Sequence, residues 1–76
     1  MTASDLELLL IAHLVRMKGG TSQSWRRVLG KIKVRDAKIH AHCNWEVTPG
    51  GTAAQRDAIE ELLDDVRLKH SIVTAG

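Results

Sequence analysis

The stretch KIKVRDAKIHAHCNWEVT, which runs from residue 31 to residue 48, decides the fold because it carries the clearest strand signal in the chain. Residues 31–35 alternate between basic side chains at odd positions and apolar ones at even positions. Residues 39–48 alternate again, now with the apolar side chains at odd positions. A period of two is typical of a strand buried on one face. The segment Asp36-Ala37-Lys38 separates the two runs, so we predict an antiparallel β-hairpin.

The register of this hairpin follows from the requirement that both apolar sets share one face, which makes the two numbers of each residue pair sum to an odd number. A sum of 75 places Trp45 opposite Gly30 and Ile32 opposite Cys43, so that the indole covers the gap left by the glycine. A sum of 73 requires a two-residue Asp-Ala turn, and Ala is poor where positive φ is needed. We therefore predict the first register. Its outward pairs are Arg35 with His40, Lys33 with His42 and Lys31 with Asn44.

The N-terminal segment is expected to form a strongly apolar helix over residues 4–18. Ser4 and Glu7 fit a capping box, and the pair Gly19-Gly20 ends the helix. Apolar residues cover most of its circumference, which is more apolar surface than one small sheet can bury. His13 interrupts them, and we expect it to be partly buried with a backbone acceptor.

Two further segments are expected to be helical. In residues 22–29 the spacing of Trp25, Val28 and Leu29 indicates a short helix, and an early strand is the alternative. Residues 52–70 begin with a second capping-box pattern and carry a largely acidic outer face. For the tail SIVTAG, over residues 71–76, a short edge strand and a frayed end both stay open.

Together these elements predict one small α+β domain over residues 1–76, in the order α, short α, β, β, α, with an antiparallel hairpin covered on one face by helices. The single cysteine cannot form an internal disulfide, so we expect a reducing, cytoplasmic location. The longest apolar run, LLLIAHLV at residues 8–15, is far shorter than the ~20 residues of a membrane span. It follows acidic rather than basic residues, unlike a signal peptide, and no membrane association is expected.

The cluster HAHCNW, at residues 40–45, raises the question of a metal site or a catalytic thiol. His40 and His42 are weak candidates for zinc ligands, because they share a strand face about 7 Å apart. Cys43 points to the opposite face, and the neighbouring strand offers only lysine and arginine as further side chains. We therefore expect no metal and no cofactor. A buried Cys43 without a base on its own side is also no nucleophile, so we predict no catalytic residue and a non-enzymatic protein.

The outward face of the hairpin is the candidate functional surface. Between Arg16 and Lys38 the chain has eight bases and one acid, whereas from Gln55 onward it has five acids and three bases. Such lopsided charge can attract an acidic protein or a phosphate backbone, and the alternative is an ordinary solvated face. The candidate anion- or partner-binding residues are Arg26, Arg27, Lys31, Lys33, Arg35, Lys38, His40 and His42.

These observations predict a small non-enzymatic cytoplasmic interaction domain that acts through contacts with an unknown protein partner. A homodimer, formed through the first helix or by extension of the sheet, would explain the excess apolar surface and the marginal two-stranded sheet. The alternative is a nucleic-acid- or anion-binding module that uses the basic face. Two features argue against nucleic-acid binding. The net charge is only +2, and no aromatic residue is expected to face outward for base stacking. No motif in the residues identifies a family.

Overall fold

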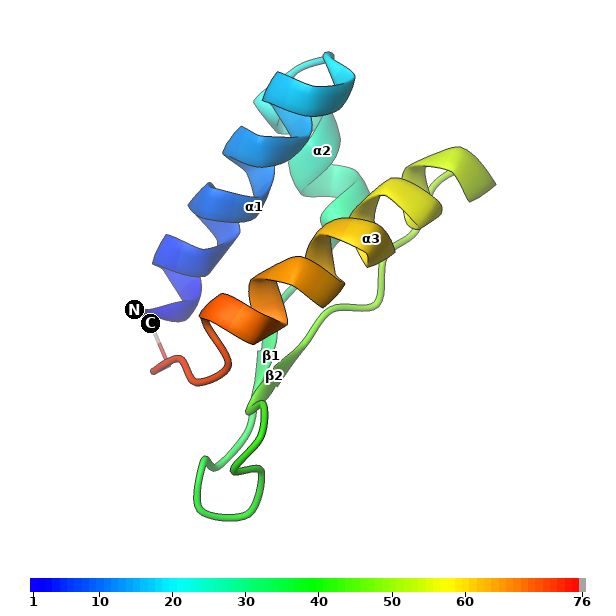
Figure 1. Cartoon of the computed structure of the whole chain (residues 1–76). Helices are drawn as coiled ribbons and strands as arrows, with labels where there is room; N and C mark the ends of the chain where they lie inside the picture. The colour runs from blue at the N-terminus through cyan, green and yellow to red at the C-terminus, as the bar shows by residue number, and fades with distance from the viewer. Residues whose placement is uncertain (76) are drawn as a thin grey trace.

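A computed structural model describes residues 1–75 of the protein, which form three helices and a two-stranded antiparallel sheet (Figure 1). In chain order the elements are α1 (Ala3–Lys18), α2 (Ser22–Leu29), β1 (Lys33–Val34), β2 (Trp45–Glu46) and α3 (Ala53–Lys69). The predicted α+β class and element order are confirmed, and the ambiguous segment before the hairpin is a helix. None of the helices in residues 1–75 has the length and apolar content needed to cross a bilayer.

The N-cap of the first helix lies two residues earlier than predicted. Thr2, not Ser4, is the N-cap, and its hydroxyl accepts a hydrogen bond from the Asp5 amide at 3.1 Å. The Asp5 carboxylate accepts from the Thr2 amide at 3.2 Å and completes the capping box, so the predicted box of Ser4 and Glu7 was wrong. Thr2 also forms a parallel bridge with Thr74, which fixes the chain ahead of the first turn.

The turn between α1 and α2 is held by an indole. Gly19 and Gly20 both have positive φ, 77° and 86°, so the helix ends where the sequence predicts. The buried Trp25 of α2 donates a hydrogen bond from Nε1 to the Gly19 carbonyl at 2.7 Å. The N-cap of α2 is Thr21, and the helix covers Ser22–Leu29. This arrangement folds α2 back against α1 (Figure 1).

The core lies between the three helices and the inward face of the hairpin. Its fully buried side chains all come from the helices and are Leu6, Leu10, Leu29, Ile59 and Leu63. The hairpin and its flanks add Ile32, Trp45 and Val47. For α3 the predicted capping box is confirmed, with Thr52 as the cap and Gln55 bonding back to its amide at 2.8 Å.

The hairpin keeps the predicted parity but not the predicted register. Lys33 pairs with Glu46 and Val34 with Trp45, so that the residue numbers sum to 79 instead of 75. The sum is still odd, and the apolar side chains therefore still share the inward face. The predicted pairing of Trp45 with Gly30 was wrong, because Gly30 caps the end of α2 with a φ of 73°. The same shift removes the predicted pairing of Ile32 with Cys43.

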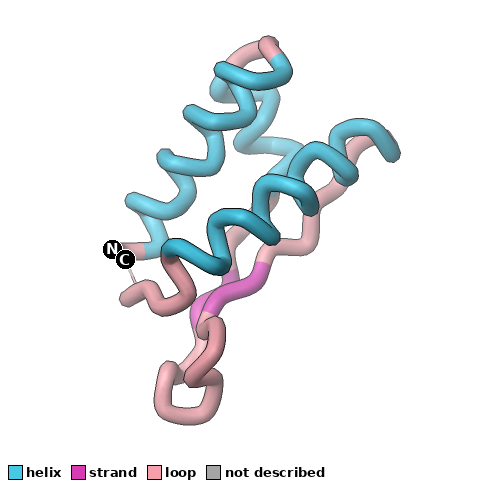
Figure 2. Tube along the Cα trace, viewed as in Figure 1, coloured by secondary structure: helices cyan, strands magenta, loops and turns pink. Residues whose placement is uncertain are grey.

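The first half of the second predicted strand, residues 39–43, is instead part of a loop over residues 36–43, which we call the tip loop (Figure 2). The Asp36 carboxylate accepts a hydrogen bond from the Lys38 amide at 2.9 Å, and its carbonyl accepts from the amides of Ile39 and His40 at 3.1 and 2.9 Å. These local bonds take the chain out of the strand ladder. The predicted outward pairs therefore do not form: Arg35 with His40, Lys33 with His42, and Lys31 with Asn44.

Asn44 joins the hairpin to the C-terminal tail. We expected this side chain to point outward, but it is only 3% exposed. Its Nδ2 donates to the carbonyls of Arg35 and Val73 at 3.0 and 2.7 Å, and its Oδ1 accepts from the Val73 amide at 2.8 Å. Its own amide donates to the Ser71 carbonyl at 3.1 Å. A polar side chain can be buried here because its hydrogen-bonding groups have partners.

The C-terminal tail ends beside the start of α1 (Figure 1). Thr74 donates its amide to the Met1 carbonyl at 3.0 Å, and its carbonyl accepts from the Ala3 amide at 2.8 Å. Of the two outcomes left open for the tail, the structure thus has a single parallel bridge, at Thr2 and Thr74. The tail connects the first helix to the hairpin through Asn44.

We expect Asn44→Ala to lower the free energy of unfolding by about 2 kcal/mol or more, because it leaves the buried amide and carbonyl of Val73 without their partner. Chemical denaturation measures this loss. The matched control is His42→Ala, two residues earlier but exposed, which should change stability by less than about 0.5 kcal/mol. Equal stability of the two variants would contradict the proposed role of Asn44.

Candidate partner-binding surface

The base of the hairpin is fixed to α3 by Trp45. This side chain is 3% exposed, and its Nε1 donates a hydrogen bond to the carbonyl of His70 at 2.8 Å. The Arg67 guanidinium lies over the indole, 5.5 Å from the ring centroid, in a cation–π contact. Because β2 is attached in this way, the tip loop starts from a rigid support.

The tip loop extends away from the helices (Figures 1 and 2). Ile39 is 76% exposed at this loop, although the alternating pattern predicts it to be inward-facing. The prediction fails here because the loop has passed beyond the helices, so that no core lies beneath it. Lys38, His40 and His42 are exposed around Ile39.

The eight predicted binding residues fall into two places. Lys38, His40 and His42 lie in the tip loop, and Lys31, Lys33 and Arg35 lie in or beside β1, which leads to it. Arg26 and Arg27 lie on α2, at the end of the hairpin away from the tip loop (Figure 1). The predicted single surface is therefore divided, and only the six residues from Lys31 to His42 belong to the hairpin.

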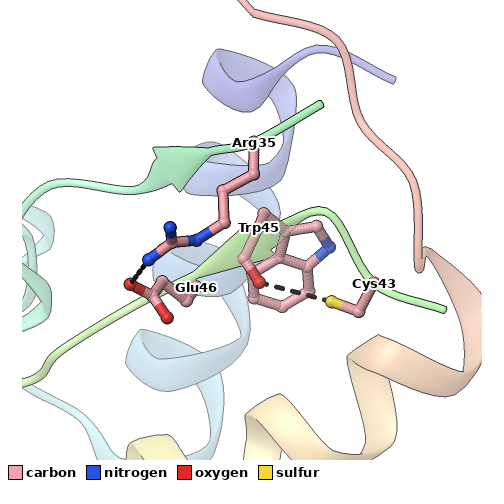
Figure 3. A network of polar contacts seen from close by, with 4 residues as sticks. All are labelled: Arg35, Cys43, Trp45 and Glu46. Atoms are coloured by element: carbon pink, nitrogen blue, oxygen red, sulfur yellow. Dashed lines mark hydrogen bonds and ion pairs between the residues drawn. The ribbon is translucent and has the colours of Figure 1, made fainter. Parts of the chain in front are cut away.

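Two of these eight basic residues form ion pairs with carboxylates. Arg26 forms an ion pair with Glu7 of α1 at 3.1 Å, and Arg35 forms one with Glu46 of β2 at 2.6 Å (Figure 3). Within residues 1–75 the other six make no ion pair with protein groups. Those six are Arg27, Lys31, Lys33, Lys38, His40 and His42.

Glu46 is the residue of this surface that sequence reasoning did not single out. Its hydrogen bond to Arg35 and the charge of that guanidinium hold the pKa of the Glu46 carboxyl below its ordinary value, and the charges of Lys33 and His40 lower it further. The role of Glu46 becomes visible only with the observed register, which places Glu46 directly opposite Lys33. The outward face of the strands is therefore partly neutralised. The lysines and the arginine of this set without an ion pair are Arg27 on α2, Lys31 and Lys33 in or beside β1, and Lys38 in the tip loop.

Cys43 is half-buried instead of fully buried as predicted. Its thiol donates a hydrogen bond to the Trp45 carbonyl at 3.3 Å (Figure 3). The thiol therefore makes a structural contact. His40 and His42 are both exposed in the tip loop. In the part of the chain that the structure describes, no three His, Cys, Asp or Glu side chains are grouped so that they could hold a metal ion.

Comparison of the chain with models of known protein families, with curated proteins and with solved structures finds no significant match. The function is therefore inferred from the surface itself.

The ion pair of the hairpin yields a measurable prediction. We expect Arg35→Gln to raise the pKa of Glu46 toward its ordinary value, because Arg35 is the largest cause of its depression. Lys33→Gln should raise it less, since Lys33 acts only through its charge. Titration of the Glu46 carboxyl carbon by NMR measures both shifts. An unchanged pKa in Arg35→Gln would show that the ion pair does not form in solution.

The sign of the linked effect on stability follows from the direction of this shift. A carboxyl whose pKa is lowered by folding stabilises the folded chain at pH values above its unfolded pKa, and this contribution disappears as the pH falls through its folded pKa. The difference in stability between the wild type and Arg35→Gln should therefore shrink as the solution is acidified through that range.

Proposed function

We propose that this protein is a small non-enzymatic interaction domain that binds an acidic surface of a partner protein through the tip loop. The observation that carries the proposal is the exposed Ile39, which stands on a projecting loop among Lys38, His40 and His42. As part of the same proposal we assign the domain to the cytoplasm, consistent with a single cysteine whose thiol is held by a backbone carbonyl.

The exposed isoleucine supports an apolar anchor. Burying a side chain of this size is worth about 1.5–3 kcal/mol, so leaving Ile39 in water forgoes that energy in the free protein. A partner pocket that covers it would recover the energy at the centre of the contact. The positive charge of Lys38 beside it speeds encounter with an acidic surface and helps to orient it.

The loop also has hydrogen bonds at both of its ends that favour one shape. The three hydrogen bonds to Asp36 close its first turn, and Asn44 holds its second end against the tail. A loop that is already fixed in shape loses less conformational entropy on binding than a flexible one. This property favours recognition of a folded partner surface.

The alternative is binding of a nucleic acid through the same basic residues. The six basic side chains that make no ion pair favour this alternative. Its weakness is the lack of a stacking platform. Trp25 and Trp45, the only aromatic residues among Phe, Tyr and Trp in the sequence, are 7% and 3% exposed. Single-stranded nucleic-acid binders depend on exposed rings for much of their affinity, so the protein partner is the better reading.

We expect Ile39→Gln to weaken capture of the partner by roughly tenfold, which corresponds to about 1.4 kcal/mol, and Lys38→Glu to weaken it similarly. Immobilised wild-type protein would be incubated with an extract of the cells that produce it, and the retained proteins would be quantified by mass spectrometry. A retained protein is then purified and titrated against each variant.

Each variant has a control that makes the same kind of substitution at another exposed position. Leu68→Gln removes another exposed apolar side chain, 86% exposed on α3, and Arg27→Glu reverses another cation without an ion pair. Both should retain the partner. If Ile39→Gln binds as well as Leu68→Gln, the tip loop is not the binding site. Binding of duplex DNA or RNA that falls steeply between about 50 and 200 mM salt would favour the alternative.

A further inference from the structure

A second surface, separate from the tip loop, lies between α1 and α3. It is a groove of about 320 Å³ whose walls are formed by the second half of α1 and the middle of α3. The lining side chains that decide its chemistry are His13, Met17 and Lys18 from α1 and Glu61, Leu62 and Asp65 from α3.

The floor of the groove is apolar and partly open to water. Met17 is 65% exposed, and Leu62 is half-buried. His13 is exposed at its edge, so our expectation of a partly buried imidazole was wrong. Methionine has a flexible and polarisable side chain, which adapts to the surface that packs against it.

The two walls carry opposite charge. Lys18 belongs to the basic last turn of α1, whereas Glu61 and Asp65 make the α3 wall acidic. Within residues 1–75 no ion pair crosses the groove, and Asp65 instead bonds Lys69 of its own helix at 3.3 Å. Lys18 and Glu61 therefore face the groove with their charges unpaired.

This distribution of charge is self-complementary. Two copies that meet face to face can be related by a two-fold axis along the groove, which places α1 of each copy against α3 of the other. Lys18 of each copy then approaches the acidic wall of its partner. A two-fold axis across the groove would place α1 on α1 and α3 on α3, so that like charges meet. We propose that the groove binds a second copy of this chain with the axis along the groove.

A dimer of standard size would extend beyond the groove along both of the helices that form it. The helices α1 and α3 have 16 and 17 residues, so each is roughly 25 Å long. A standard interface covers about 800 Å² on each partner, which is roughly one sixth of the 5035 Å² surface of the chain. In this dimer both long helices contribute, and the tip loops of the two copies remain free.

Charge reversal tests both the dimer and its axis. Sedimentation equilibrium should show the wild type as a dimer at about 0.5 mM, and Lys18→Glu and Glu61→Lys should each weaken dimerisation by about tenfold, because each change occurs twice in a two-fold dimer. The double variant K18E/E61K should restore it. Arg27→Glu is the matched control and should dimerise like the wild type.

Each other result overturns the proposal. A monomeric wild type at this concentration excludes the dimer. Single reversals without effect place the contact elsewhere, and a double variant that stays weak excludes the axis along the groove. Met17→Gln, which keeps the size of the side chain and removes its apolar end, should weaken the dimer as well, and an unchanged dissociation constant would contradict the apolar floor. Circular dichroism of every variant confirms that the exposed substitutions leave the fold intact.

These results are independent of the function proposed above. Ile39→Gln and Lys38→Glu should dimerise normally, and K18E and E61K should still capture the tip-loop partner. A loss of dimerisation in the tip-loop variants would show that the dimer surface was misassigned, and a loss of partner capture in the groove variants would show the same of the partner-binding surface.

Discussion

The hydrogen bonds between Asn44 and Val73 are the contact on which the rest of the structure depends. They join residues 29 positions apart and bring the tail across the end of the hairpin. The Asn44 side-chain amide also donates a hydrogen bond to the carbonyl of Arg35, the residue that follows β1. With Asn44 held, Thr74 reaches the start of α1 and connects the first helix to the sheet. A two-stranded sheet is marginal alone, and here it is supported on one side by the tail and on the other by α3.

The register of the hairpin follows from this contact. When Asn44 turns inward to the tail, β2 can begin only at Trp45, and the indole takes its place under the end of α3. Ten residues, 35–44, then connect the strands, which is more than a tight turn needs. Residues 36–43 among them form the projecting tip loop, and the polar and apolar side chains that alternate along it all lie near solvent. The exposure of Ile39 is thus a consequence of pairing at the other end of the hairpin.

Much of the fold was predictable from the sequence because its signals are local. Gly19 and the Thr52–Gln55 capping box define helix ends through bonds between residues at most four apart, and periodicity was enough to assign the helices. The parity of the hairpin was also predictable. Its register was not, because sums of 75 and 79 satisfy parity equally and the choice depends on a bond to residue 73. An asparagine that satisfies a distant backbone segment leaves no periodic signal.

The same limit applies to the surface. The cations of the hairpin could be identified from composition, but the neutralisation of Arg35 by Glu46 depends on the register, and the separation of Arg26 and Arg27 from the tip loop depends on the packing of α2. The groove charges were visible only once α1 and α3 were placed side by side.

The residue that follows each long helix accepts a hydrogen bond from an indole N–H through its carbonyl. Trp25 donates to Gly19 after α1, and Trp45 donates to His70 after α3. The sequence contains no tyrosine. All of its near-ultraviolet emission therefore comes from two rings, one at the contact of α1 with α2 and one at the contact of the hairpin with α3. The molecule thus carries its own pair of spectroscopic probes, and the order in which its two halves assemble can be followed by light without any added label.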